Sequence, residues 1–128
     1  MEINPKTSHT DENIQRLGYF SRAYRKTLET YLKFIIPQKV SLLDVGCGTG
    51  FFSASFDTKE YLGIDSSAEQ VKEARRNNLE AKFEHDEAEN LESKKIYDYI
   101  LLSDTLNEMS DVQSALQNLH KCQGILSF

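Results

Sequence analysis

Residues 44–50 are the part of the chain whose residue types and spacing most clearly suggest chemistry. They read Asp-Val-Gly-Cys-Gly-Thr-Gly, and Asp44 belongs to a short apolar run that leads into the glycines. An apolar run that ends in glycines is typical of a buried strand entering a tight turn. Because glycine has no Cβ, a ligand can lie against the backbone at Gly46, Gly48 and Gly50. The pattern therefore predicts a ligand-binding turn.

The spacing disfavours two common nucleotide motifs. A dinucleotide-binding G-x-G-x-x-G that began at Gly46 would place its third glycine at position 51, which is Phe51. A P-loop that began there would require lysine at position 52, which is Phe52. The acid at position 44 would also repel a pyrophosphate, whereas it suits a cationic ligand. A ligand that carries positive charge fits the pattern better than a dinucleotide does.

Predicted strands and helices alternate along the chain. Strands are predicted at residues 41–46, 61–65, 81–86, 97–104 and 124–128. Helices are predicted at residues 17–36, 49–56, 67–78 and 111–121. This alternation predicts an α/β fold with a doubly wound, Rossmann-like parallel sheet and helices on both faces. Residues 1–16 are polar and are predicted to form a flexible arm, with one domain at residues 17–128.

Acidic residues follow the predicted strands. Asp65 ends the second strand, 19 residues after Gly46, and its carboxylate could accept hydrogen bonds from both ribose hydroxyls of a nucleoside. The alternative role for Asp65 is to cap the following helix. Asp86 and Glu87 stand at the end of the third strand, where a carboxylate could accept from the exocyclic amine of adenine or stand in a solvated turn. The carboxyl ends of parallel strands lie at one edge of a sheet, so we expect these acids to lie close together.

The glycine turn and the acids together resemble class I S-adenosylmethionine-dependent methyltransferases over about residues 19–121. The resemblance implies strand order 3-2-1-4-5, S-adenosylmethionine as cofactor, S-adenosylhomocysteine as product, and methyl transfer to a small-molecule acceptor that we do not identify. It implies that Gly46, Cys47 and Gly48 back the methionine part of the cofactor and that the Ser103 region, at the end of the fourth strand, meets its amino-acid end. The cofactor-binding residues expected on this basis are Asp44, Gly46, Cys47, Gly48, Gly50, Asp65, Ser66, Asp86, Glu87 and Ser103. No side chain is assigned as a catalytic base.

The sequence departs from this family at its end. Such domains usually continue into an antiparallel hairpin, which is missing after Phe128. A truncated chain, a minimal variant, and a homodimer that pairs through the open sheet edge are three explanations. The alternative function is a cofactor-binding domain without turnover, because the part that binds the acceptor is absent.

The composition of the chain narrows the classes of protein to which it could belong. The net charge is −5, and residues 41–128 hold sixteen Asp or Glu against eight Lys or Arg, which disfavours a nucleic-acid partner. No apolar run is long enough to cross a membrane, and no leader pattern opens the chain. Cys47 and Cys122 lack the spacing of metal ligands, so no metal site is predicted. These features predict a cytoplasmic protein. A nicotinamide-dependent oxidoreductase is a further rival, and the glycine spacing disfavours it.

Overall fold

The computed structural model describes residues 22–92, 94–102 and 109–122, and its contacts divide the chain into two units, Met1–Ile35 and Ile36–Phe128. In the first unit, residues 22–35 are helical, so the helix predicted at residues 17–36 ends one residue earlier than expected, and residues 17–21 lie outside the described part. The predicted arm at residues 1–16 lies outside the described residues.

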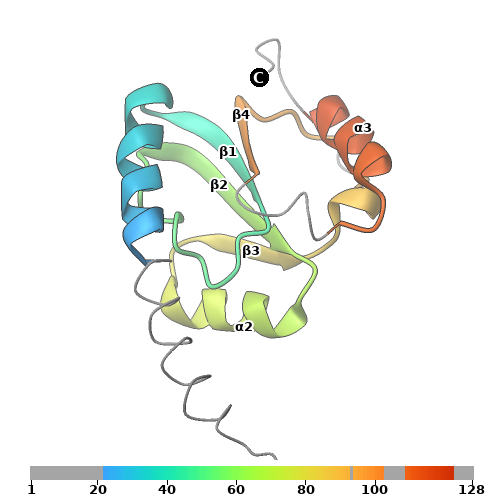
Figure 1. The fold of residues 1–128 in the computed structure, drawn as a ribbon, viewed down its shortest axis with the longest axis horizontal. Coiled ribbons are helices and arrows are strands. Elements are labelled where there is room, and N and C mark those ends of the chain that lie inside the picture. Colours follow the sequence, from blue (N-terminus) through green and yellow to red (C-terminus); the bar gives the residue numbers. More distant parts are fainter. Residues whose placement is uncertain (1–21, 93, 103–108, 123–128) are drawn as a thin grey trace, which may run out of the picture. The chain divides into compact units, whose positions relative to one another are not determined.

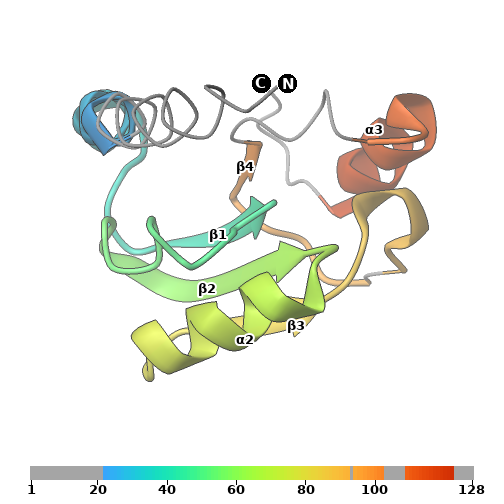
Figure 2. The same ribbon diagram turned by 60° about the horizontal axis from the view of Figure 1, so that its bottom comes forward.

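The second unit contains a parallel sheet with helices on both faces. Its elements are β1 (Val40–Val45), β2 (Thr58–Asp65), α2 (Ala68–Asn77), β3 (Lys82–His85), the 3₁₀ helix η1 (Ala88–Asn90), β4 (Tyr99–Leu102) and α3 (Val112–Cys122). The strand order is β3-β2-β1-β4, and every pair is parallel. Figures 1 and 2 show α2 and α3 on opposite faces of the sheet. The predicted fold class is confirmed, while the predicted fifth strand and the sheet edge proposed for dimerisation lie outside the described residues.

Strand β1 forms the centre of the sheet, and all six of its residues are buried. A strand that is covered on both faces reads as a continuous apolar run, which explains the pattern in the sequence. On one face, Leu43 and Val45 pack in a cluster with Ala115 and Leu119 of α3. The spacing of four residues in α3 places both side chains on the helical face that meets the sheet.

Helix α2 is fixed at both ends. The Ser67 hydroxyl caps its first turn by accepting a hydrogen bond from the Gln70 N–H at 3.3 Å. Near its end, Arg75 donates two hydrogen bonds to the Phe83 carbonyl oxygen, at 3.2 and 2.7 Å. These bonds hold the helix against β3 and so fix the region where β2 and β3 end.

The helix predicted at residues 49–56 is wrong. This segment forms successive turns in which the N–H groups of Gly50 and Ser53 bond carbonyls three residues earlier. The hydroxyl of Ser53 also donates to the Gly50 carbonyl at 2.8 Å, and that of Ser55 donates to the Phe51 carbonyl at 3.4 Å. Serine side chains that bond local carbonyls compete with regular helix hydrogen bonding, which accounts for the difference.

Gly63 lets the glycine turn approach the sheet. A Cβ at this position would lie 2.8 Å from the Phe83 ring and 2.9 Å from the Cβ of Cys47. Both distances are shorter than van der Waals contact, so no larger residue fits without displacing the turn or β3.

We expect Gly63→Ala to lower the free energy of unfolding by about 1–3 kcal/mol, the usual cost of overpacking. Urea denaturation measures the change. Because the ring of Phe83 makes the closest contact, the same substitution in a Phe83→Leu background should cost less. An equal cost in both backgrounds would contradict the steric explanation.

Candidate functional site

The glycine turn is fastened to the end of β2 by backbone hydrogen bonds. The N–H groups of Gly46 and Cys47 both donate to the Ile64 carbonyl, at 2.8 and 3.0 Å. The N–H of Gly48 donates to the Asp65 carboxylate at 2.9 Å. These three amides therefore hold the turn in place.

The turn requires glycine because its backbone is left-handed. The φ angles are +74° at Gly46, +56° at Gly48 and +86° at Gly50, a region that other residues rarely adopt. At Gly48 an added Cβ would meet only the Gln70 side chain, at 3.9 Å. An added Cβ at Gly48 would therefore meet no backbone atom and only the end of a flexible side chain, so a ligand can approach this glycine closely.

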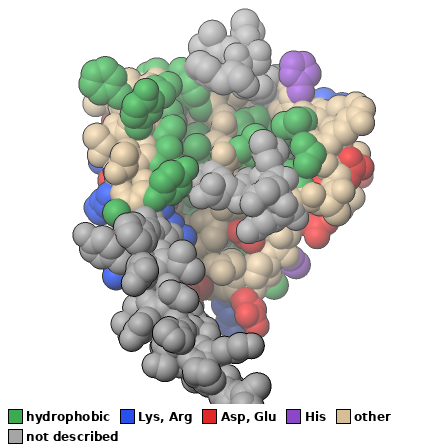
Figure 3. Space-filling model, viewed as in Figure 1, with side chains coloured by type: hydrophobic (Ala, Val, Ile, Leu, Met, Phe, Trp, Pro, Cys, Tyr) green, Lys and Arg blue, Asp and Glu red, His purple; other side chains and the backbone are tan. Residues whose placement is uncertain are grey.

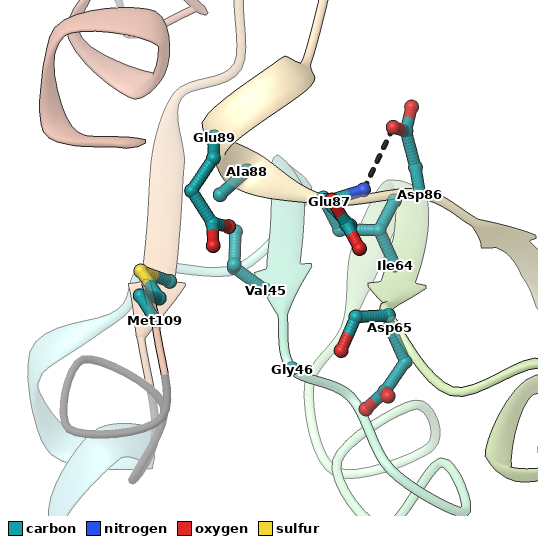
Figure 4. Close-up of a pocket in the computed structure, with 10 residues that line it drawn as sticks. Val45, Gly46, Ile64, Asp65, Asp86, Glu87, Ala88, Glu89 and Met109 are labelled. Carbon is teal, nitrogen blue, oxygen red and sulfur yellow. Dashed lines mark hydrogen bonds between the residues drawn. The ribbon is translucent and has the colours of Figure 1, made fainter. Parts of the chain in front are cut away.

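A cavity lies at the carboxyl ends of the strands, and Figure 4 shows how its walls are built. It is lined by Val45, Gly46, Ile64, Asp65, Ser66, Asp86, Glu87, Ala88, Glu89 and Met109. Four of these residues are carboxylic acids and none is Lys or Arg. Figure 3 shows acidic side chains on the side of the molecule that carries α3. The described walls of the cavity therefore favour a ligand that carries positive charge.

The acids in the cavity wall differ in their surroundings. The Asp65 carboxylate accepts the N–H of Gly48 with one oxygen and the N–H of Ser67 with the other, both at 2.9 Å. Asp86 accepts the N–H of Glu87 at 2.7 Å, and Figure 4 shows its carboxylate turned away from Asp65. Asp65 is therefore the acid that joins the glycine turn to the start of α2.

One wall of the cavity depends on α3. The amide of Asn118 donates to the carbonyls of Ala88 and Glu89, at 3.0 and 2.8 Å, and so holds η1. The Glu89 carboxylate accepts the N–H of Ser110 at 3.2 Å and its hydroxyl at 3.3 Å. Figure 4 shows the Glu89 side chain extending toward Val45 and Met109. These bonds join η1 to the segment that carries Met109.

Asp44 lies beneath the glycine turn and is 1% exposed. Its Oδ2 accepts the Tyr61 hydroxyl at 2.6 Å, whereas its Oδ1 is buried with no hydrogen-bond partner in the described part of the chain. Burial raises the pKa of the Asp44 carboxyl to about 6, the Tyr61 hydrogen bond opposes that rise, and the nearby charge of Asp65 adds to it. A buried carboxylate with an unsatisfied oxygen lowers the stability of the fold.

Cys47 is a small spacer rather than a nucleophile. Burial raises the pKa of its thiol to about 12, and the charges of Asp44 and Asp65 add to the rise. A nucleophilic cysteine needs a lowered thiol pKa. The thiol therefore stays protonated at neutral pH, and its role is to pack against Gly63.

The structure brings most of the predicted site residues together. Gly46, Asp65, Ser66, Asp86 and Glu87 line the cavity. Asp44, Cys47, Gly48 and Gly50 form the turn and the end of the strand that precedes it. Ser103 lies outside the described residues, and the role of each residue in binding stays a prediction.

Sequence reasoning missed five lining residues: the apolar Val45, Ile64 and Ala88, and also Glu89 and Met109. Glu89 belongs to the short 3₁₀ helix η1, which begins just after Glu87 and brings the Glu89 side chain to the cavity. A helix of three residues in a polar stretch leaves only a weak signal in the sequence. Met109 reaches the cavity through the bonds between Ser110 and Glu89, which no local pattern reveals.

Because the pKa of Asp44 is higher in the folded chain than in the unfolded chain, its contribution to stability is full below about pH 4 and is lost as pH rises through about 6. We therefore expect Asp44→Asn to raise the free energy of unfolding by about 1–2 kcal/mol at pH 7.5, since the unpaired amide offsets part of the gain. Urea denaturation at pH 7.5 and pH 4 measures this, and the gain should disappear at pH 4.

Asp57→Asn is the matched control, because Asp57 is exposed and precedes the opposite end of β2. A gain for Asp44→Asn that is the same at both pH values would contradict the raised pKa.

Comparisons with known proteins identify the class that this fold and site define. A family model described as a methyltransferase domain matches residues 36–126, and the chain belongs to that family. The family predicted from the sequence is thus confirmed.

Curated relatives include the ubiquinone biosynthesis O-methyltransferase of Rickettsia akari, which is 28% identical over 89 residues. The match covers 65% of this chain and 36% of the relative, so the chain spans about a third of the length of the curated relatives it matches.

Solved structures of methyltransferases share the fold. The plantazolicin methyltransferase BpumL, solved with S-adenosylhomocysteine, is 28% identical with a TM-score of 0.68, and the match covers 94% of this chain and 50% of that one. A TehB-like S-adenosylmethionine-dependent methyltransferase from Corynebacterium glutamicum is 20% identical with a TM-score of 0.70. The match covers 93% of this chain and 69% of that one. Because the TehB-like protein is only 20% identical to this chain, the comparison with it shows a shared fold and nothing more.

Proposed function

We propose that this chain binds S-adenosylmethionine at the carboxyl edge of the sheet. The observation that carries the proposal is the cavity wall beside the glycine turn, which has four carboxylic acids and no Lys or Arg. S-adenosylmethionine brings a sulfonium and an ammonium group, and an acidic cavity favours both. A pyrophosphate-containing cofactor would meet repulsion from the same wall.

The residues present fit this cofactor. Each oxygen of Asp65 accepts one backbone N–H, and a carboxylate has about four acceptor positions, so capacity is left for the ribose hydroxyls. The open space at Gly48 suits the methionine part. Asp86 and Glu87 line the cavity and are the residues that would hold the adenine, and Ser66 adds a hydroxyl to the lining.

We propose methyl transfer to a small-molecule acceptor as the activity. The cofactor supplies a methyl group on sulfur that is already activated, so the chain's own contribution is to orient the cofactor and to exclude water from it. The names of the curated relatives, which are O-methyltransferases, support this class of reaction. Binding without turnover is the alternative, and a methylation assay separates the two.

The setting of this activity is also a proposal. We propose the cytoplasm as the compartment, and none of the helices in the described part of the chain is long and apolar enough to cross a membrane. We propose a small molecule rather than nucleic acid as the partner because of the acidic charge of the chain. A homodimer through the sheet edge is proposed as well, and sedimentation equilibrium would show a single-chain mass if it does not form.

We expect calorimetry to show binding of S-adenosylmethionine and S-adenosylhomocysteine but not of NAD. Asp65→Ala should weaken binding by about 1–3 kcal/mol, since charged hydrogen bonds to the ligand and the anchor of Gly48 are both lost. Asp57→Ala removes the same charge at the opposite end of β2 and should leave the affinity unchanged. Equal affinities for Asp65→Ala and the unmodified chain would contradict the ribose role.

Transfer of a labelled methyl group from S-adenosylmethionine into a pool of small metabolites tests the reaction. We expect label in a small-molecule product, and the loss of that label in Asp65→Ala at cofactor concentrations well below saturation. Tight cofactor binding without any labelled product would favour the alternative of a binding domain.

A further inference from the structure

The 3₁₀ helix η1 is too short to hold its own position. The N–H groups of Asn90 and Leu91 bond the carbonyls of Glu87 and Ala88, at 3.0 and 3.4 Å, which closes a helix of three residues. A helix of this length is not stable by itself. The position of η1 in the cavity wall must therefore come from the elements that pack against it.

Asn118 of α3 supplies that support. Its amide nitrogen donates to the carbonyls of Ala88 and Glu89, at 3.0 and 2.8 Å, and so uses both of its hydrogens. Because both partners are carbonyl oxygens, only the NH₂ side of the amide can face them. Ala88 is 3% exposed and packs in one cluster with Ala115 and Leu119 of the same helix. Helix α3 therefore fixes η1 through one polar side chain and one apolar cluster.

Glu87 stands directly before η1 and lines the cavity. Its carboxylate accepts a hydrogen bond from the side-chain amide of Asn90 at 2.8 Å, so the last residue of η1 orients it. Figure 4 shows the Glu87 side chain on the side of Ile64, whereas the Asp86 carboxylate points away. The place of the Glu87 carboxylate is thus tied to η1, and through η1 to Asn118.

A carboxylate distinguishes purine bases by the hydrogens that it can accept. Adenine presents an amine at carbon 6, which can donate to a carboxylate. Hypoxanthine presents an oxygen at the same carbon, which a carboxylate repels. The distinction requires the carboxylate at hydrogen-bond distance, about 3 Å between heavy atoms, so a small shift of η1 would weaken it. Selectivity for the base therefore depends on the residue that holds η1.

We propose that Asn118 is a positioning residue that sets the base selectivity of the site, by holding η1 where Glu87 can accept from the 6-amino group of adenine. This inference rests on the proposed function. Asn118 is not among the described residues that line the cavity, and it acts through the carbonyls of Ala88 and Glu89. Loss of its amide should change which base is bound more than it changes how tightly the rest of the ligand is held.

Asn118→Asp tests the proposal because it keeps the shape of the side chain and removes the donor. Competition binding gives the dissociation constants of S-adenosylhomocysteine and S-inosylhomocysteine, which differ only at the base and carry the same charge. The ratio of the two constants measures base selectivity. A general loss of stability, or a change in the charge near the cavity, would alter both constants alike. A role confined to stability would therefore leave the ratio unchanged.

For the unmodified chain, we expect S-adenosylhomocysteine to bind about tenfold to a hundredfold more tightly than the inosyl compound, the range for one hydrogen bond to a charged group. In Asn118→Asp the preference should fall to below about threefold. Asn77→Asp is the matched control, because it makes the same change at an exposed position of α2, on the other face of the sheet. It should keep the unmodified ratio.

Two further variants keep the test decisive if Asn118→Asp does not fold. Asn118→Ala removes the donor without adding charge, and alanine favours a helix, so the preference should again fall. Glu87→Gln removes the carboxylate through which Asn118 is proposed to act. Adding Asn118→Ala to Glu87→Gln should therefore change the ratio no further, whereas independent roles would give additive losses.

A ratio in Asn118→Asp or Asn118→Ala equal to that of the unmodified chain would overturn the inference and leave the proposed function intact. Equal affinity of the unmodified chain for the two ligands, or additive losses in the double variant, would do the same. An unmodified chain that binds neither ligand would overturn both the inference and the proposed function.

Discussion

The hydrogen bond from the Gly48 N–H to the Asp65 carboxylate joins the two strand ends that form the site. It fixes the turn after β1 against the end of β2, and the bonds from Gly46 and Cys47 to the Ile64 carbonyl complete the attachment. The same carboxylate bonds the N–H of Ser67, which caps α2. One acid therefore joins the turn to the start of the next helix, and it is the acid that we propose binds the ribose of the cofactor.

The site gathers negative charge at the cost of stability. Burial raises the pKa of the Asp44 carboxyl and the nearby charge of Asp65 adds to the rise, while Asp86, Glu87 and Glu89 add negative charge to the cavity wall. Such an arrangement lowers the stability of the fold, and the binding of a cation would offset that loss. The negative charge of Asp44 therefore lowers the stability of the fold, while the same charge would raise the affinity for a positively charged cofactor.

Much of the fold could be predicted from the sequence because its strands are short, buried and parallel. Such strands appear as apolar runs with an acid or glycine at the end, as in residues 42–46 and 61–65. The start of β2 was missed because Thr58–Glu60 are polar and largely exposed, although they continue the strand beside Val40 and Ser41. The turns at residues 49–56 were misread as helix because serine hydroxyls there bond local carbonyls.

The parts of the site that could not be predicted depend on strand register and tertiary contact. The pairing of Tyr61 with Asp44 follows from the alignment of β1 with β2, which sequence patterns do not specify to the residue. The wall at η1 depends on Asn118 of α3, almost thirty residues away along the chain. Local patterns can indicate which residues end a strand, but they do not indicate which distant side chain holds them.

Backbone amide chemical shifts, followed by NMR during titration with S-adenosylmethionine, test the central claim most directly. We predict that the largest changes fall on residues 46–50, 65–66 and 87–89, the turn and the strand ends that surround the cavity. Changes centred instead at the opposite edge of the sheet, around Lys59 and Leu79, or no changes at saturating ligand, would contradict the account.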